Sequence, residues 1–334
     1  FGSSHFGSSL LGTRASGPLD VQCLRMRHVH RSMSRLGFVD MRFHCICSAL
    51  AGLVVQAIAG ASFPDLSLLQ WNPHWQCTVW DVNNCTAQAG NALANMLQVE
   101  DVDFANLIEY ADSASILPEN WTSIRSAPVC GKDSLDLIYN SARWTPAHDV
   151  PPVHGCMEVS PPDRPFIIQE FVAEAASWRV IVIAAHFPHP ANRWDTSMGE
   201  MSALRDALRI FLGSTSTRRV LLIADTNEYS LISNEKIMEY LYGQGDSTIG
   251  TALRATCCFD IGFQEGATFD RIIANFGRSM ETEVLFDPLP VWAMEVRGGE
   301  RGDFHKGIRA ALRSSARSSL RASRSGTGNH PTEQ

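Results

Sequence analysis

The chain lacks the short motifs that identify several common enzyme classes. It has no Gly-x-Ser-x-Gly turn, no Gly-x-x-x-x-Gly-Lys-Ser/Thr loop and no His-Glu-x-x-His helix, which argues against serine hydrolases, nucleotide-triphosphate motors and zincins. It also lacks a Cys-x-x-Cys pair, so a structural zinc site is not expected. No repeat recurs along the chain, and this excludes a solenoid.

The composition is that of an ordinary soluble globular protein. The 334 residues are 45% hydrophobic and 19% charged, which excludes collagen, coiled coil and wholesale disorder. The length fits two domains of average size or one large α/β or sandwich domain. The net charge of -7 is unevenly spread, because residues 62–305 hold 16 basic and 32 acidic side chains while both ends are basic.

Residues 41–61 have the layout of a secretory signal peptide, with a short basic start, an apolar run and a small-x-small end before Ser62. The alternatives are a membrane anchor or a buried core helix, but the run is short for a span and contains Gln56. We therefore expect residues 1–40 to be a disordered upstream extension and residues 41–61 to be cleaved. The mature protein would have no membrane span and would be secreted or remain in the secretory-pathway lumen.

The cysteines agree with this location. Removing residues 1–61 leaves six, and an even number suits an oxidising compartment. We predict disulfides between Cys77 and Cys85 and between Cys130 and Cys156, because each pair closes a local loop.

The C-terminal segment is basic. From Lys306 onward, arginines recur among Ser, Ala and Gly. This pattern predicts a short helix followed by a solvated, disordered tail, which we place at residues 313–334. The sharper alternative is an arm that attracts the phosphates of nucleic acid or anionic lipid.

Strands and helices are expected to alternate through the middle of the chain. Runs rich in β-branched and aromatic residues predict strands at 66–69, 135–139, 166–173, 179–185, 220–224 and 269–274. Apolar residues at helical spacing predict helices at 87–97, 201–212 and 235–242. The runs 179–185 and 220–224 are apolar throughout, which suits strands buried on both faces in the middle of a sheet.

Polar side chains stand where several of these strands end. Taken singly, each has a structural explanation, such as a turn, a solvated helix end or a hydrogen-bonded core histidine. Together they indicate a catalytic site, because strand ends on a rigid sheet hold side chains accurately. The set consists of Asn72, Glu109, His186, Asp225, Asn227 and Asp270.

These side chains suit metal-assisted hydrolysis of a phosphate ester. Glu109 and neighbouring oxygens fit a hard cation such as Mg²⁺, which takes few protein ligands. His186 can carry a proton, and a carboxylate beside it, for which Asp270 is the candidate, would fix its tautomer. Asp225 would polarise an attacking water, and Asn227 would orient a phosphate oxygen or the nucleophile.

The same residues, in this order, resemble the endonuclease/exonuclease/phosphatase superfamily and, within it, the secreted deoxyribonuclease I-like enzymes. The matching segments span residues 64–312. They imply Asn72 and Glu109 as metal ligands, Tyr139 near the scissile phosphate, His186 as the catalytic histidine, Asp225 with Asn227 in a "GDFN"-like element, and Asp270 in a "YDRI"-like segment where the Asp supports the first histidine.

Three positions depart from the pattern of that superfamily. Ile108 stands where Gln is usual, and Ala224 stands where Gly is usual. The closing Ser-Asp-His triplet has its nearest match in Asp303-Phe304-His305, with one residue inserted between Asp and His. The resemblance implies that His305 and Asp303 form a second catalytic pair. In an extended strand the two side chains would point to the same side, so a local bulge is needed or the pair works differently.

The resemblance implies an α/β (α+β) domain over residues 62–312, a four-layered α/β sandwich of two packed, mostly antiparallel β-sheets flanked by helices. It implies a monomeric hydrolase of phosphodiester bonds that uses Mg²⁺, with Mn²⁺ or Ca²⁺ as alternatives. A nucleic acid or another phosphodiester would be the substrate.

The sequence leaves the substrate open. The fold also supports inositol-phosphate phosphatases, sphingomyelin-type phosphodiesterases and binding proteins that have lost the chemistry. Strong nucleic-acid binders usually have a basic face, which this chain would have only if the fold gathers its arginines near the site. The candidates are Arg143, Arg164, Arg179, Arg193, Arg271, Arg278, Arg297 and Arg301.

Overall fold

The structure is a computed structural model of the chain. It describes residues 63–81, 84–126, 130, 133–157, 164–175, 178–188, 201–227, 232–243, 247–257, 267–294 and 304–314. The expected upstream extension, signal peptide and most of the basic tail lie outside the described residues, as does Asp303.

Six strands form the first sheet, in the order β12-β13-β1-β2-β4-β3. β1 and β2 are parallel neighbours, and every other neighbouring pair in this sheet is antiparallel. The strands are β1 (Leu66–Trp71), β2 (Phe104–Ile108), β3 (Trp121–Arg125), β4 (Leu135–Asn140), β12 (Ser279–Val284) and β13 (Ile308–Arg313).

Seven strands form the second sheet, in the order β10-β11-β9-β8-β7-β5, with β6 also paired to β7. Only β8 and β9 are parallel among its described pairs. The strands are β5 (Trp144–Pro146), β6 (Val153–Met157), β7 (Arg164–Ala173), β8 (Arg179–His186), β9 (Val220–Asp225), β10 (Ile249–Gly250) and β11 (Asp270–Ala274).

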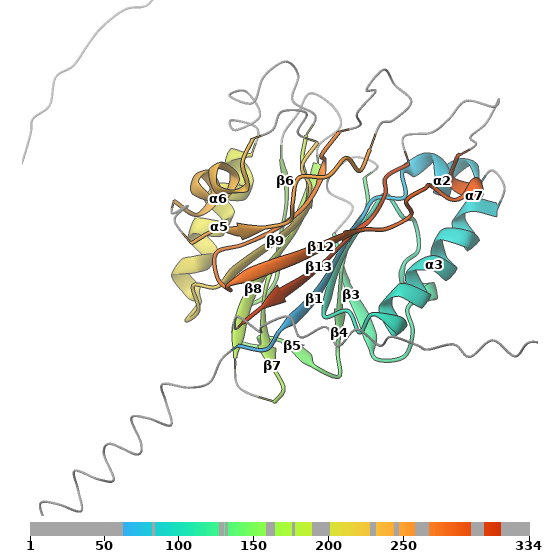
Figure 1. The fold of residues 1–334 in the computed structure, drawn as a ribbon. Coiled ribbons are helices and arrows are strands. Elements are labelled where there is room, and N and C mark those ends of the chain that lie inside the picture. The colour runs from blue at the N-terminus through green and yellow to red at the C-terminus, as the bar shows by residue number, and fades with distance from the viewer. Residues whose placement is uncertain are drawn as a thin grey trace, which may run out of the picture. The chain divides into compact units, whose positions relative to one another are not determined.

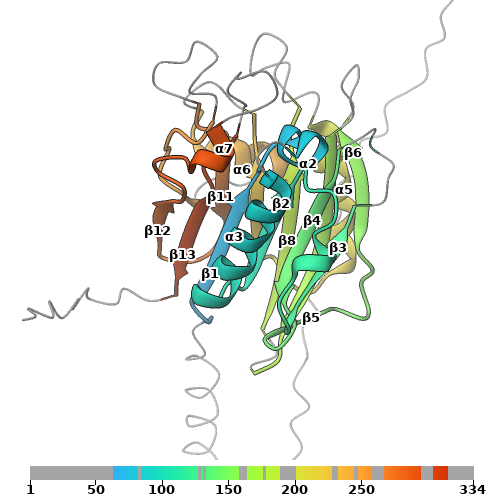
Figure 2. The ribbon, with the colours of Figure 1, turned by 90° about the vertical axis from the view of Figure 1, so that its right-hand side faces the viewer.

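The two sheets pack face to face, and helices lie on both outer faces (Figure 1). α3 (Cys85–Val99) crosses the outer face of the six-stranded sheet, while α5 (Ser202–Ser214) and α6 (Asn234–Tyr242) lie beyond the seven-stranded sheet (Figure 2). None of the described helices is long and apolar enough to cross a membrane. The shorter helices are α2 (Trp75–Trp80), the 3-10 turn η2 (Ala114–Ile116) and α7 (Val291–Met294). This is the four-layered sandwich that the sequence motifs implied.

Three apolar layers hold the sandwich together. Leu68 and Phe104 of the first sheet pack against Val182 and Ile223 of the second to form the layer between the sheets. The other two layers lie under α3 and under α5 with α6. Burying one side chain of this size contributes about 1.5–3 kcal/mol, so the middle layer holds the two sheets together. The fully apolar runs are the central strands β8 and β9, as predicted.

The C-terminal segment forms a strand, and the predicted short helix is wrong. Residues of β13 alternate between buried and partly exposed, with Ile308, Ala310 and Leu312 inward. The outward Arg309 and Arg313 pair with carboxylates, so a period of two explains residues that looked helical and basic.

Both predicted disulfides are present. Cys77 is bonded to Cys85 and Cys130 to Cys156. The first ties α2 to the start of α3, and the second ties the segment before β4 to β6. Each closes a local loop, which was the reason for predicting it.

A buried carboxyl group on β4 makes stability depend on pH. Asp136 is 1% exposed and lies beside Ser113 without a hydrogen bond of acceptable geometry to either carboxylate oxygen. Burial raises its pKa from 3.8 to about 6, against the opposing effect of Arg125. The ionised form is therefore disfavoured in the folded protein.

Asp136→Asn should stabilise the protein only at higher pH. Because the folded pKa lies above the unfolded one, the wild type has no ionisation penalty below about pH 4 and the full penalty above about pH 6. We expect the variant to be more stable by ~1–2 kcal/mol at pH 7.5 and equal or weaker at pH 4, measured by urea unfolding. Exposed Glu119→Gln is the control. An equal difference between Asp136→Asn and wild type at both pH values would contradict the prediction.

Candidate active site

Polar residues that follow the parallel strands meet at one end of the sandwich. β1 and β2 are parallel neighbours, so Asn72 and Glu109, which come directly after them, lie at the same end. β8 and β9 are parallel in the other sheet and end at His186 and Asp225, which are register partners. All four side chains are buried.

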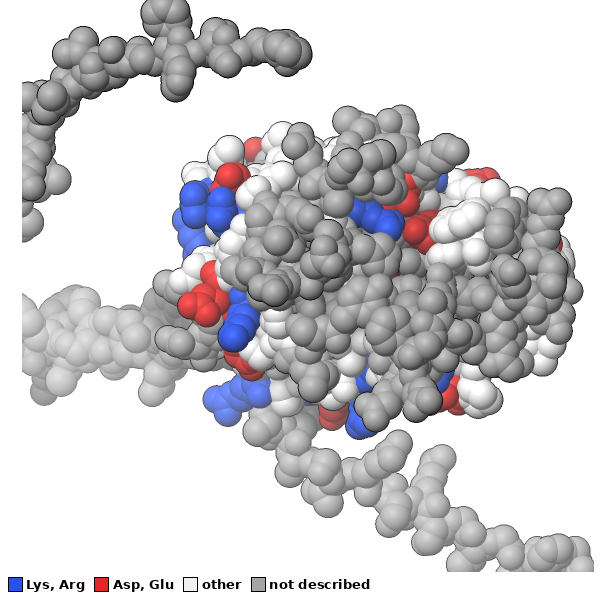
Figure 3. Space-filling view, turned by 90° about the horizontal axis from the view of Figure 1, so that it is seen from above, with Lys and Arg blue, Asp and Glu red and all other residues white. Residues whose placement is uncertain are grey.

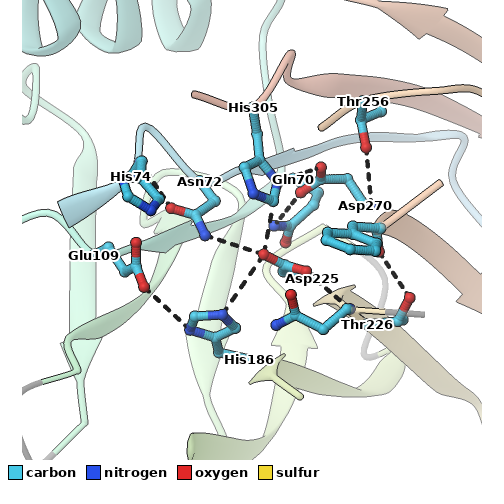
Figure 4. A network of polar contacts seen from close by, with 12 residues as sticks. Gln70, Asn72, His74, Glu109, His186, Asp225, Thr226, Thr256, Asp270 and His305 are labelled. Carbon is cyan, nitrogen blue, oxygen red and sulfur yellow. Dashed lines mark hydrogen bonds and ion pairs between the residues drawn. The ribbon is translucent and has the colours of Figure 1, made fainter. Parts of the chain in front are cut away.

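Antiparallel strands begin at the same end and add two more of the predicted residues. β11 runs antiparallel to β9 and begins with Asp270, opposite Asp225. β13 runs antiparallel to β1, and just before it the backbone N–H of His305 donates to the carbonyl oxygen of Asn72 at 3.3 Å. The close view in Figure 4 shows these side chains converging from both sheets on Asp225.

Asp225 is the centre of this arrangement. Its Oδ2 accepts a hydrogen bond from Asn72 Nδ2 at 3.0 Å and lies 3.6 Å from both His186 Nε2 and His305 Nδ1. Its Oδ1 accepts the backbone N–H of Asn227 at 3.0 Å. Burial opposes ionisation, but the two histidines and these hydrogen bonds hold the pKa of Asp225 below its usual value. Asp225 is therefore a buried, ionised carboxylate.

His305 has a carboxylate partner of its own. Its Nδ1 lies 2.8 Å from Asp270 Oδ2. Burial disfavours the charged ring, but the negative charges of Asp270 and Asp225 outweigh burial and raise the pKa of His305 to about 9. The ring is positively charged at neutral pH.

The predicted pairing of His186 with Asp270 is wrong. His186, Asp225 and Asp270 are register partners across β8, β9 and β11, so Asp225 stands between the other two. Neighbouring strands are about 4.8 Å apart, which separates the backbones of His186 and Asp270 by about 10 Å. The order of strands in the sheet decides the pairing.

His186 instead faces Asp133 and Arg164. Its Nδ1 lies 3.2 Å from Asp133 Oδ2 and 3.1 Å from Arg164 Nη1. The same Nη1 donates to Asp133 Oδ2 at 2.6 Å and lies 3.4 Å from Glu109 Oε1. Burial raises the pKa of Asp133, but His186 and Arg164 outweigh it and hold the value at about 2. One guanidinium therefore balances two carboxylates at this side of the site.

Sequence reasoning did not place Asp133 in the site and left the position of Arg164 open. Asp133 precedes β4, which is antiparallel to β2, and Arg164 opens β7, which is antiparallel to β8. The start of an antiparallel strand lies beside the end of its neighbour. Polar residues before strands, considered together with those after strands, are the signal that would have found both.

Tyr139 lies outside the site, so its expected place at a scissile phosphate is wrong. It is opposite Phe104 at the start of β2, whereas Glu109 follows the end of that strand. The separation along the strand is roughly 16 Å. Tyr139 packs against Phe171 at the layer between the sheets, with ring centroids 4.9 Å apart. The pairing of His305 with Asp303, which lies outside the described residues, stays a prediction.

The backbone bends sharply just beyond three of the strands. His74, Glu109 and Asn227 have positive φ angles of 68°, 56° and 48°. Residues other than glycine adopt this left-handed region rarely and at a cost in free energy. Hydrogen bonds hold these bends, since Glu109 N–H donates to the Ser134 carbonyl at 2.8 Å and Asn227 Nδ2 to the Phe187 carbonyl at 2.8 Å. Such bends turn side chains from the strand direction toward a shared centre.

The donor set fits a hard divalent cation. Asn72 Oδ1 accepts one hydrogen bond from His74 N–H, and Glu109 Oε2 accepts one from Trp75 N–H, each at 2.8 Å. Each of these oxygens keeps a further lone pair, and oxygen ligands are those that Mg²⁺ prefers. Two groups of residues each bring their potential ligand atoms within 4.8 Å of one another. One group is Glu109, Asp133 and His186, and the other is Asp225, Asp270 and His305.

The arginines do not form one basic field among the described residues. Arg164 lies in the site, but Arg143 and Arg179 pair with carboxylates at the opposite end of the strands. Arg271 is buried. Seen from above, described basic and acidic side chains are interspersed (Figure 3). Among the described arginines of this set, Arg164 therefore places positive charge in the site.

Solved structures share this fold. No family model and no curated protein matches the chain. An endonuclease/exonuclease/phosphatase from Bacteroides vulgatus is 14% identical with a TM-score of 0.55, covering 76% of this chain and 100% of that chain. A mannosyl-6-phosphatase from Bacteroides thetaiotaomicron is 14% identical with a TM-score of 0.53, covering 74% of this chain and 99% of that chain. TDP2 from D. rerio, complexed with a single strand DNA product, is 12% identical with a TM-score of 0.52, covering 75% and 99%.

These likenesses show that the chain has the endonuclease/exonuclease/phosphatase fold, as its motifs indicated. Deoxyribonuclease I-like enzymes, which the motifs of this chain resemble, share that fold.

Magnesium should stabilise the wild type through Glu109. A cation that binds only the folded protein adds about 1 kcal/mol at five times its dissociation constant, which raises Tm by about 2–4 °C. We expect this rise in MgCl2 relative to EDTA by differential scanning calorimetry, and its loss in Glu109→Gln. Exposed Glu239→Gln on α6 is the control and should keep it. A full Mg²⁺ response in Glu109→Gln would remove Glu109 from the ligand set.

Proposed function

We propose that this protein is a metal-dependent hydrolase of phosphodiester bonds, most specifically a secreted deoxyribonuclease I-like endonuclease. The observation that carries the proposal is the buried, ionised Asp225 between two histidines, each with an acidic partner of its own. Asp270 serves His305 in this way, and Asp133 serves His186.

Hydrolysis of a phosphodiester needs a proton acceptor on one side of the phosphorus and a proton donor on the other. An oxygen of water bonds to phosphorus and gives up a proton, while one P–O bond breaks and the leaving oxygen gains a proton. Asp225 is ionised and can polarise the attacking water, with Asn227 orienting a phosphate oxygen. His305 is charged at neutral pH and can donate to a phosphoryl or leaving oxygen, while His186 can carry the proton on the other side.

Positive charge for the phosphate would come from two sources. Arg164 offers a guanidinium beside Glu109 and His186, and guanidinium donors match phosphate oxygens well. A Mg²⁺ held by Asn72 and Glu109, with Mn²⁺ or Ca²⁺ as alternatives, would add Lewis-acid charge at the phosphate oxygens.

The comparisons support this class of chemistry. One protein of the same fold is a phosphatase, and another was solved with a single strand DNA product. The DNA product supports a nucleic-acid substrate, and the phosphatase supports a phosphomonoester as the alternative. The two disulfides favour an oxidising compartment, and we extend the proposal to a protein that is secreted or held in the secretory-pathway lumen.

Nicking of supercoiled plasmid by the purified protein tests the proposal. We expect nicking with Mg²⁺ or Mn²⁺ and none in EDTA. His186→Ala should lower the rate about 10²–10⁴-fold, which is the usual contribution of a general acid or base. His154→Ala removes an exposed histidine of β6 and should leave the rate unchanged. All variants are first compared by thermal melting, so that loss of fold is not mistaken for loss of chemistry.

Other outcomes would change the proposal in defined ways. If the folded wild type leaves plasmid and single-stranded DNA intact but hydrolyses inositol phosphates, sphingomyelin or a phosphomonoester, the nuclease assignment is wrong and the hydrolase assignment holds. If the protein hydrolyses none of these substrates in the presence of any metal ion tested, it has kept the fold without the chemistry.

A further inference from the structure

A chain of buried amides runs from the middle of the sandwich to His305. Asn106 Nδ2 on β2 donates to Gln70 Oε1 on β1 at 2.8 Å, and Gln70 Nε2 donates to Asp270 Oδ1 on β11 at 3.0 Å. Asp270 binds His305 through its other oxygen, Oδ2, at 2.8 Å. Asn106 and Gln70 are both fully buried. This series of hydrogen bonds therefore links two amides, in the layer between the sheets, to His305.

The amides join the first sheet to the second. Asn106 Nδ2 also lies 3.1 Å from the carbonyl oxygen of Ala185 on β8 and 3.0 Å from that of Ile223 on β9, so its two N–H groups are shared among three acceptors. Gln70 makes the bond to Asp270 on β11 of that same sheet. Since Asp270 and His305 come from different sheets, the alignment of this pair depends on such links.

The chemistry of the partners permits one orientation of the Gln70 amide. The Asn106 NH2 group can only donate, and the Asp270 carboxylate in its ionised form can only accept. Gln70 must therefore turn its oxygen to Asn106 and its NH2 group to Asp270. Reversing either amide would place oxygen against oxygen or NH2 against NH2.

The arrangement has a cost that packing alone would not require. Asn106 Oδ1 is buried without a hydrogen-bond partner, which costs stability, and apolar residues of similar shape would avoid that cost. Two apolar side chains would also fill the layer between the sheets without orienting Asp270. A buried amide kept at such a cost, and aimed at a carboxylate of the site, indicates a role in that site.

We propose that Asn106 and Gln70 are positioning residues that fix the Asp270 carboxylate so that Oδ2 faces His305. Gln70 holds Oδ1, which prevents the carboxylate from rotating, and Asn106 fixes the orientation of Gln70. Both act through Asp270 and neither touches a substrate. For catalysis this inference rests on the proposed function, but its statement about His305 does not.

The test compares Gln70→Leu and Asn106→Leu with Gln169→Leu in the full chain. Gln169 on β7 is the matched control, because it is also fully buried, donates to two carbonyl oxygens and has an unpaired Oε1, away from the site. Nitrogen NMR of histidine-labelled protein gives a signal for His305 Nδ1 that reports its hydrogen bond. This signal is assigned because it disappears in His305→Phe. Steady-state kinetics on a nicked or hydrolysed substrate reports kcat and KM separately.

We expect the Nδ1 signal of His305 to shift in Gln70→Leu and Asn106→Leu and to stay in place in Gln169→Leu. We expect kcat to fall about 10- to 100-fold in Gln70→Leu with KM nearly unchanged, because the misplaced Asp270–His305 pair acts in the chemical step. In an Asp270→Asn background, Gln70→Leu should add little further loss, since the two changes interrupt the same link.

An unmoved Nδ1 signal in Gln70→Leu would overturn the inference, as would equal losses of kcat in Gln70→Leu and Gln169→Leu. A shifted signal in a protein that hydrolyses no phosphoester would uphold the positioning of Asp270 and refute the proposed function, so the two failures are distinguishable.

Discussion

The alignment of the two packed sheets relative to each other is the constraint on which the candidate site depends. Asn72, Glu109 and His305 belong to the six-stranded sheet, while His186 and Asp225 belong to the other. The apolar layer between the sheets sets their separation but not their alignment, because hydrophobic contact is not directional. Directional bonds across the layer, such as that from Asn72 to Asp225, supply the alignment.

Charge balance is the second constraint, and it makes the site residues interdependent. Asp133 is partly buried, Asp225 is fully buried, and both are ionised; they are balanced by Arg164 and the charged His305. Removing one member of such a set leaves a buried charge without compensation, which is strongly destabilising. Effects of substitutions here will not add. Glu109 and Asp270 bring further acidic groups, which favours a bound cation at this end of the sandwich.

Much of the fold could be predicted because its strands and helices carry strong local patterns. The apolar runs of β8 and β9 and the helical spacing in α5 are properties of neighbouring residues, so the sequence displays them directly. β13 was missed because Arg309 and Arg313, four residues apart among Ala and Leu, also fit a basic helix. Only pairing with β1 and β12 makes the extended form favourable there.

By itself, the sequence determined which residues stand at strand ends, which cysteines lie close enough in the chain to pair, and which motifs resemble those of the endonuclease/exonuclease/phosphatase superfamily. Only the tertiary structure decided that Asp270 contacts His305, that Asp133 and Arg164 flank His186, and that Tyr139 packs against the layer between the sheets. The physical reason is that partners across a sheet are set by the order and direction of strands, and these depend on contacts far apart in the sequence.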